Sequence, residues 1–311
     1  MSMMAMASRM CQTLVVRGSA SNAGVHMTGF MDEDIVKEIL ILMIPILCLL
    51  AMVGCRAAPG AECMIVAHRG ASQDAPENTL AAFRLGFEQG ADRIEGDFRM
   101  TSDGHIIAMH DRTLSRTTGD PRETADVPLG GIRSLGAGDW GPWKGGEFRN
   151  EGVPTLAEVL AIVPEDRGIL VEVKDSDRIV PVLIRELERS GLDRDRVAVI
   201  AFDREVVATM KRASPKWKAM WLTSFSRRNG TWSPTVDEVI EIAKSIGADG
   251  VDVEADPAVV DRTFVERVRS AGLELHVWTV NDPQLALVLR EIGVDSITTD
   301  RPAVIRKAIV R

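Results

Sequence analysis

Short apolar runs alternate with longer amphipathic segments from residue 64 onward. Runs rich in β-branched and other apolar residues predict strands at 64–69, 92–98, 105–110, 168–174, 196–202, 218–223, 249–253, 273–280 and 294–299. Most of these runs are separated by segments of helix length, with apolar residues three and four positions apart. This alternation, sustained over about 250 residues, predicts an α/β fold of the (β/α)8 or TIM barrel type. Nine candidate strands then compete for eight barrel positions.

A doubly wound open sheet is the competing fold, but no glycine-rich phosphate-binding loop follows the first strand. Two polar segments interrupt the alternation. Residues 111–153 are rich in Gly, Pro, Asp and Arg, and we expect them to form a long excursion over one end of the barrel. A shorter excursion is expected at 224–235.

An apolar run at 39–54 precedes the barrel region. It is shorter than the roughly 20 residues that span a bilayer, and it contains Pro45, so a secretory signal peptide is the first interpretation. A retained anchor and a buried helix are the alternatives. The residues "MVGC" resemble a bacterial lipoprotein signal, which predicts lipidation of Cys55 and an exported, membrane-tethered protein facing the periplasm or the exterior. Otherwise Cys55 is an ordinary residue of a cleaved leader.

The expected organisation therefore has four parts. Residues 1–35 form a non-native or unstructured extension, 36–55 the signal peptide ending at Cys55, 56–63 a short linker, and 64–311 the barrel domain.

Composition limits the classes of function and the means of stabilisation. The chain is 45% hydrophobic and 26% charged, enough to bury a large core. Its net charge of −8 argues against a nucleic-acid partner, which requires a basic face. The four cysteines, at positions 11, 48, 55 and 63, all precede residue 64, so no disulfide framework can hold the barrel region.

Acidic residues interrupt two of the predicted strands. Glu95 and Asp97 are two residues apart and share one face of a strand, and Glu172 and Lys174 repeat this arrangement. Inward-facing charges are costly unless they are paired or bind a metal. Oxygen ligands without cysteine favour Ca²⁺ or Mg²⁺ over zinc. The alternative is a set of structural salt bridges.

Two histidines end predicted strands. His68 and His110 would both reach the carboxyl-terminal face of a barrel, where two imidazoles suit acid and base roles. Arg69 offers donors for a phosphate oxygen, although a salt bridge to Glu77 is an alternative. Trp278 lies near a strand end, where its indole would pack either on an apolar part of a substrate or in the core.

Taken together, these segments resemble the glycerophosphodiester phosphodiesterase family. The matching motifs occur in the family's order from residue 67 to 302: "AHRG", "PENTLAAF", "IEGDFRMTSDGHIIAMHD", "LSRTTG", "PTLAEVL", "VEVK", "VWTVN" and "ITTDRP". The resemblance implies a TIM barrel with a short insertion after the second catalytic histidine. It also implies metal-dependent hydrolysis of glycerophosphodiesters, such as glycerophosphocholine or glycerophosphoethanolamine, to glycerol 3-phosphate and an alcohol.

The resemblance also implies roles for individual residues. The metal ligands would be Glu95, Asp97 and Glu172, the acid and base His68 and His110, the phosphate contacts Arg69 and Lys174, and an acid near the metal Glu77. In the family's proposed mechanism the 2-hydroxyl of the glycerol attacks phosphorus, and a cyclic phosphate is then hydrolysed. Which histidine acts first stays open.

Two other functions compete with this one. A related barrel phosphodiesterase would act on intact or lyso-phospholipid, for which the aromatic segment 138–148 is the only indication. A non-catalytic lipoprotein would only bind phosphorylated ligands, but the chain retains every histidine and acid of the set. The headgroup alcohol, the native cation and the oligomeric state are not set by the sequence.

Overall fold

The computed structural model describes residues 63–309. The expectations for the extension, the signal peptide and Cys55 therefore lie outside the described residues. Cys63, the last residue of the expected linker, is buried just before the first strand and belongs to the main hydrophobic cluster. No helix within 63–309 has both the length and the apolar character needed to cross a membrane.

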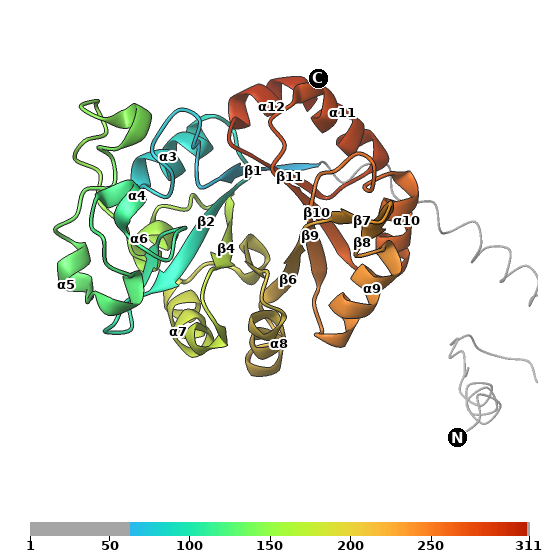
Figure 1. The fold of residues 1–311 in the computed structure, drawn as a ribbon, viewed down its shortest axis with the longest axis horizontal. Coiled ribbons are helices and arrows are strands. Elements are labelled where there is room, and N and C mark those ends of the chain that lie inside the picture. Colours follow the sequence, from blue (N-terminus) through green and yellow to red (C-terminus); the bar gives the residue numbers. More distant parts are fainter. Residues whose placement is uncertain (1–62, 310–311) are drawn as a thin grey trace, which may run out of the picture. The chain divides into compact units, whose positions relative to one another are not determined.

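Eight parallel strands form a closed barrel at the centre of this region (Figure 1). The first strand pairs with both the second and the last, and this double pairing closes the sheet and excludes the open alternative. In chain order the strands are β1 (Met64–His68), β2 (Arg93–Met100), β4 (Gly168–Val173), β5 (Val197–Ala201), β6 (Lys218–Thr223), β9 (Gly250–Glu254), β10 (Glu274–Trp278) and β11 (Ser296–Thr299). The predicted TIM barrel is confirmed.

The ninth candidate strand lies outside the barrel. β3 (Ile106–Ala108) runs antiparallel to β2, with Phe98 opposite Ala108. It therefore turns the chain back along β2 and starts the insertion, which resolves the competition between nine candidates and eight positions.

Helices surround the barrel and cover the outward faces of its strands (Figure 1). Most of them begin at polar caps, and the Thr79 side chain accepts a hydrogen bond from the Ala82 N–H at the start of the first of them. Their bounds are α3 (Leu80–Glu88), α6 (Leu156–Ala161), α7 (Val180–Ser190), α8 (Arg204–Ala213), α9 (Val236–Ser245), α10 (Arg262–Ser270), α11 (Pro283–Ile292) and α12 (Pro302–Ile309), with short 3-10 turns η3 (Asp177–Ile179) and η4 (Arg194–Arg196).

The strands divide their side chains between two apolar clusters. Val171 and Val173 of β4 point outward into the large cluster between the sheet and the helices. A smaller cluster fills the barrel interior and consists of Val66, Leu170, Ala198, Ile200, Met220 and Leu222. Apolar side chains thus pack one part of the barrel interior, and polar side chains occupy the adjoining layer of the interior.

The insertion at 111–153 has a core of its own. It contains α4 (Ser115–Thr118), η1 (Thr124–Asp126), α5 (Leu129–Ile132) and η2 (Gly141–Trp143), and it lies beside the barrel next to α6 (Figure 1). Its buried cluster consists of Ile107, Met109, Leu114, Val127, Ile132, Ala137 and Val153. The shorter excursion at 224–235 forms a hairpin of β7 (Ser226–Arg228) and β8 (Thr231–Ser233).

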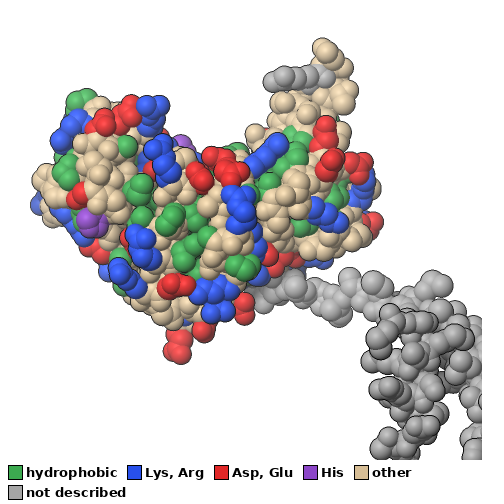
Figure 2. All heavy atoms as spheres, turned by 90° about the horizontal axis from the view of Figure 1, so that it is seen from below, with side chains coloured by type: hydrophobic (Ala, Val, Ile, Leu, Met, Phe, Trp, Pro, Cys, Tyr) green, Lys and Arg blue, Asp and Glu red, His purple; other side chains and the backbone are tan. Residues whose placement is uncertain are grey.

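Basic and acidic side chains are interspersed on the face of the molecule that Figure 2 shows. The described residues form many ion pairs near the surface, such as Lys216 with Glu188 and Arg269 with Asp295. No single sign of charge dominates this face of the described residues.

Candidate active site

Three carboxylates converge at the carboxyl-terminal ends of the first strands. The strand register places His68 beside Glu95, and Asp97 beside Glu172. One oxygen from each of Glu95, Asp97 and Glu172 lies within 4.8 Å of the others. All three side chains are almost fully buried. The expected acid cluster therefore exists, and its members come from β2 and β4.

The electrostatics of this cluster are those of a site that could hold a cation. Glu95 Oε1 and Asp97 Oδ1 are buried without a hydrogen-bond partner. Burial, and then the charge of Asp97, raises the pKa of Glu95 well above its usual range and that of Glu172 to about 7. Burial opposes ionisation of Asp97 as well, but Arg69 and Lys174 outweigh it and lower that pKa.

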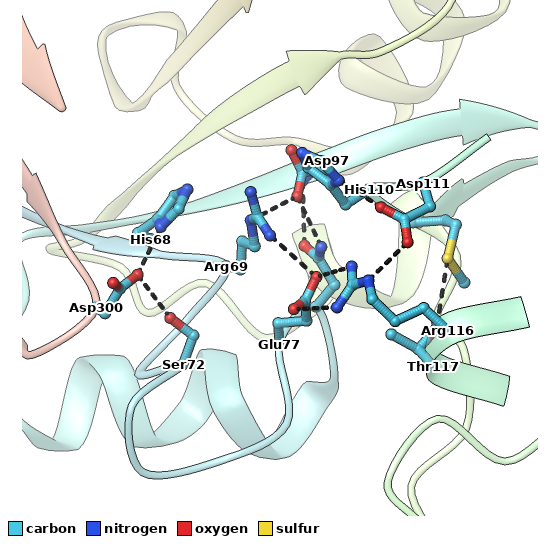
Figure 3. Close-up of polar contacts among 12 residues, drawn as sticks. His68, Arg69, Ser72, Glu77, Asp97, His110, Asp111, Arg116, Thr117 and Asp300 are labelled. Atoms are coloured by element: carbon cyan, nitrogen blue, oxygen red, sulfur yellow. Dashed lines mark hydrogen bonds and ion pairs between the residues drawn. The ribbon is translucent and has the colours of Figure 1, made fainter. Parts of the chain in front are cut away.

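Two cations lie against these acids. Lys174 Nζ is 2.7 Å from Glu172 Oε1 and 3.3 Å from Asp97 Oδ1. Arg69 Nε is 3.1 Å from Asp97 Oδ2, although it is not aligned for a hydrogen bond. Figure 3 shows this contact between the two side chains. Two cations against three carboxylates leave one negative charge without compensation if all three acids ionise. The donor set, all oxygen and partly unsatisfied, fits a hard divalent cation.

The loop after β1 is shaped to hold the cluster. Arg69 adopts a left-handed backbone conformation with φ 55°, and its main-chain N–H donates to Glu95 Oε2 at 2.9 Å. Gly70 follows with φ 81°, where an added Cβ would overlap the main chain of Ala82. Asn78, also left-handed, donates from Nδ2 to Asp97 Oδ2 at 2.8 Å. In this loop, the two non-glycine residues with positive φ, Arg69 and Asn78, are thus residues that contact the acids.

Each histidine is oriented by a carboxylate (Figure 3). His68 Nδ1 lies 2.6 Å from Asp300 Oδ1, and Asp300 also accepts hydrogen bonds from Ser72 and Asn281. His110 Nδ1 lies 2.7 Å from Asp111 Oδ1. If each carboxylate accepts a proton-bearing Nδ1, each ring keeps Nε2 for a substrate.

Asp300, Asp111 and Arg116 were not among the residues singled out from the sequence. The only signal for Asp300 was its place in "ITTDRP", directly after β11, the strand that closes the barrel against β1. Asp111 follows His110 directly, and Arg116 lies in the matching motif "LSRTTG".

Glu77 lies between two arginines and is not a member of the described acid triad. Its carboxylate accepts from Arg69 at 3.1 Å and from both terminal nitrogens of Arg116 at 2.8 Å. Arg116 Nε donates to Asp111 Oδ2 at 2.6 Å. Arg116 therefore links Asp111, the partner of His110, to Glu77, the partner of Arg69. Because Arg116 belongs to the insertion, these contacts also connect the insertion to the loop after β1.

Most of the side chains predicted for the site line a cavity of about 270 Å³. Trp278 lies on its wall, half-buried, with its ring in an edge-to-face contact with Phe202 at 5.6 Å. A wider, open groove of about 850 Å³ adjoins it and shares Glu172, Lys174 and Phe202 with it. The structure thus brings together the predicted set: His68, Arg69, Glu95, His110, Glu172, Lys174 and Trp278 line the cavity, while Asp97 and Glu77 contact residues that do.

Comparison with known proteins agrees with this geometry. Residues 68–304 match the glycerophosphoryl diester phosphodiesterase family. A glycerophosphodiester phosphodiesterase of Caldanaerobacter subterraneus is 31% identical over 245 residues, covering 77% of this chain and 94% of the relative. One of Bacillus subtilis is 30% identical over 257 residues, covering 78% of this chain and 85% of the relative.

Solved structures are similar as well. A phosphodiesterase of Oleispira antarctica, solved with the product sn-glycerol-3-phosphate, superposes with a TM-score of 0.69 at 27% identity, covering 80% of this chain and 97% of that one. A glycerophosphodiester phosphodiesterase of Agrobacterium tumefaciens has a TM-score of 0.65 at 27% identity, with 79% and 100% covered. With its barrel, its strand-end acids and its two histidines, the chain therefore belongs to the glycerophosphoryl diester phosphodiesterase family and is a phosphodiester hydrolase.

Proposed function

We propose that the chain hydrolyses small glycerophosphodiesters, such as glycerophosphocholine or glycerophosphoethanolamine, to glycerol 3-phosphate and an alcohol, with one divalent cation. The observation that carries the proposal is the meeting of the acid triad with two carboxylate-oriented histidines in one cavity. Glycerol 3-phosphate is the product bound in the Oleispira antarctica structure.

Glu95, Asp97 and Glu172 would hold the cation, Ca²⁺ or Mg²⁺. A bound cation would polarise a substrate oxygen and neutralise charge that develops on the phosphoryl group. The unsatisfied oxygens of Glu95 and Asp97 support this assignment, because a buried carboxylate oxygen without a partner is costly. Binding would also release the proton that burial holds on Glu95.

Five side chains would contact the substrate directly. Arg69 and Lys174 would contact the phosphate oxygens and give up part of their contact with Asp97 to do so. Nε2 of one histidine would take the proton of the attacking 2-hydroxyl, and Nε2 of the other would protonate the departing alcohol. Burial lowers the pKa of His110, which favours its neutral form. The indole of Trp278 would pack on an apolar part of the substrate.

A chelation assay tests this function. The full chain, stripped of metal, is incubated with glycerophosphocholine and with lysophosphatidylcholine, with and without added Ca²⁺ or Mg²⁺. We expect metal-dependent release of glycerol 3-phosphate from glycerophosphocholine and much slower turnover of the lysolipid. Turnover that chelation leaves unchanged would contradict the metal site, and preference for the lysolipid would favour the competing lipid-directed function.

The non-catalytic alternative is tested by the histidines. General acid and base catalysis contributes roughly 10²-fold to 10⁴-fold, so His68→Ala and His110→Ala should each lower kcat by a factor in that range. Full activity in both purified variants would refute the assignment of the site.

We also propose that the protein is exported and tethered to the membrane through Cys55. The support is the apolar run at 39–54 ahead of that cysteine. Mass spectrometry of the mature protein tests it: we expect an amino-terminal, acylated Cys55, and an intact peptide covering residues 2–35 would contradict it.

A further inference from the structure

Two polar side chains line the cavity on strands that take no part in the acid triad. Asp252 lies on β9 and Thr298 on β11, and both line the cavity although they are only 1% and 2% exposed. In the strand order of the barrel, β9 is diametrically opposite β2, which carries Glu95 and Asp97. The cavity therefore has a second polar wall across from the acids.

Neither side chain is satisfied by its surroundings. Asp252 Oδ1 and Thr298 Oγ1 have no hydrogen-bond partner among the described residues. His276, the strand neighbour of Asp252 on β10, is engaged instead with Ser296 at 2.6 Å and Glu274 at 3.3 Å. Buried polar atoms are nearly always paired, so two unpaired oxygens on the wall of one cavity indicate a ligand group that completes them.

The chemistry of this wall suits a hydroxyl group. A carboxyl oxygen and a threonine hydroxyl together can accept a ligand's proton and donate to its oxygen. A phosphate group does not suit this wall, because an ionised Asp252 would repel it. A cation shared with the acid triad does not explain Asp252 either, because the triad consists of Glu95, Asp97 and Glu172. The neighbouring surface is apolar, formed by Ile200, Leu222 and Trp278, and the Trp278 indole N–H donates to the main-chain oxygen of Asp252 at 3.2 Å. A short carbon chain that ends in a hydroxyl matches both properties.

The cavity and the groove together indicate which part of a diester substrate would contact Asp252 and Thr298. The narrow cavity and the open groove meet at Glu172 and Lys174, where the phosphate would lie. Both histidines line the cavity, and neither lines the groove. The glycerol carries the attacking 2-hydroxyl and is common to all glycerophosphodiesters, so it belongs in the narrower cavity beside the histidines. The variable alcohol then occupies the open groove.

We infer that Asp252 and Thr298 bind the terminal hydroxyl of the glycerol unit and thereby select diesters in which that hydroxyl is free. The inference rests on the proposed function and adds a source of specificity to it. An acyl ester at the terminal oxygen removes the donated proton and places a bulky chain in a cavity of only about 270 Å³. A site built to hydrogen-bond a substrate hydroxyl rejects the analogue that lacks it much more strongly than an apolar pocket rejects a change in size.

A substrate analogue tests the inference. The full chain is assayed with glycerophosphocholine and with the phosphocholine diester of propane-1,2-diol, which keeps the 2-hydroxyl and lacks the terminal one. We expect the wild type to show kcat/KM lower by on the order of 100-fold for the analogue. Asp252→Ala should lose activity on glycerophosphocholine by a similar factor and little on the analogue, with Thr298→Val showing a smaller loss of the same pattern. Thr223→Val, at a buried β6 position outside the cavity lining, is the matched control.

Each other outcome overturns the inference in a distinguishable way. Equal kcat/KM of the wild type for both diesters, or equal losses of Asp252→Ala on both, shows that Asp252 does not bind the terminal hydroxyl while the proposed function stands. A loss in Asp252→Ala that is equal on both phosphocholine diesters and absent with glycerophosphoglycerol assigns Asp252 to the cationic headgroup instead. Hydrolysis of neither diester with any metal overturns the proposed function, and the inference with it.

Discussion

His68 Nδ1 lies 2.6 Å from Asp300 Oδ1, and the two residues are 232 positions apart in the sequence. The contact exists because β1, which ends at His68, pairs with β11, which ends one residue before Asp300. Closure of the barrel therefore also orients one of the two histidines of the site.

Asp300→Asn should lower kcat by about 10-fold to 100-fold. Burial opposes ionisation, but hydrogen bonds from His68, Asn281 and Ser72 lower the pKa of Asp300 to about 2, so it is a carboxylate at any assay pH. Asparagine keeps the shape but removes the charge that stabilises a protonated His68. Steady-state kinetics should show the loss in kcat with KM nearly unchanged. Asp74→Asn, at an exposed site in the loop after β1, is the control, and an equal loss there would contradict a specific role for Asp300.

Arg116→Ala should lower kcat/KM by about 10-fold, because it releases two carboxylates at once. Asp111 would lose the partner that, above all others, lowers its pKa to about 2, and Glu77 would be left with Arg69 alone. Steady-state kinetics of the variant measures the effect. Arg122→Ala removes an exposed ion pair with Asp120 in the same insertion and should change activity by less than about twofold. If both variants behave alike, the link through Arg116 has no role in the site.

Metal removal should lower the melting temperature. A cation at 100 times its dissociation constant stabilises the folded state by about 2.7 kcal/mol, which corresponds to a shift of roughly 5 to 10 °C for a domain of this size. Adding Ca²⁺ or Mg²⁺ to the chelated wild type should therefore raise the melting temperature in a thermal scan.

Glu172→Gln should abolish most of that shift, whereas Glu188→Gln, at a surface ion pair, should retain it. A wild-type melting temperature that does not respond to either cation would refute the metal site, independently of any activity measurement.

The fold was predictable from the sequence because its signals are local. Alternating apolar runs gave the strands, and the spacing of Glu95 and Asp97 placed both acids on one face. Contacts that depend on strand order were not predictable in this way. Asp300 reaches His68 only through barrel closure, and β3 resembles a barrel strand in composition although it pairs antiparallel. Asp252 looked like an ordinary strand residue, and only its missing partner distinguishes it.

The free energy of unfolding should fall as pH rises because of the buried carboxyl group of Asp252. Burial raises the pKa of this carboxyl from 3.8 to about 7, and His276 offsets the effect only in part. Between about pH 4 and pH 7 the folded state keeps the proton and the unfolded state loses it, so the folded state binds more protons and the free energy of unfolding falls as pH rises.

Asp252→Asn removes this titration. The free energy of unfolding of the variant should therefore exceed that of the wild type by an amount that grows across this pH interval, to at most about 4 kcal/mol. Urea unfolding of the metal-free proteins at pH 5 and pH 8 measures the difference. The difference in the free energy of unfolding should be smaller at pH 5 than at pH 8, and Asp249→Asn, at a less buried aspartate paired with Lys211, should not reproduce this increase. A constant difference between the wild type and Asp252→Asn at the two pH values would show that Asp252 is not held protonated by its burial.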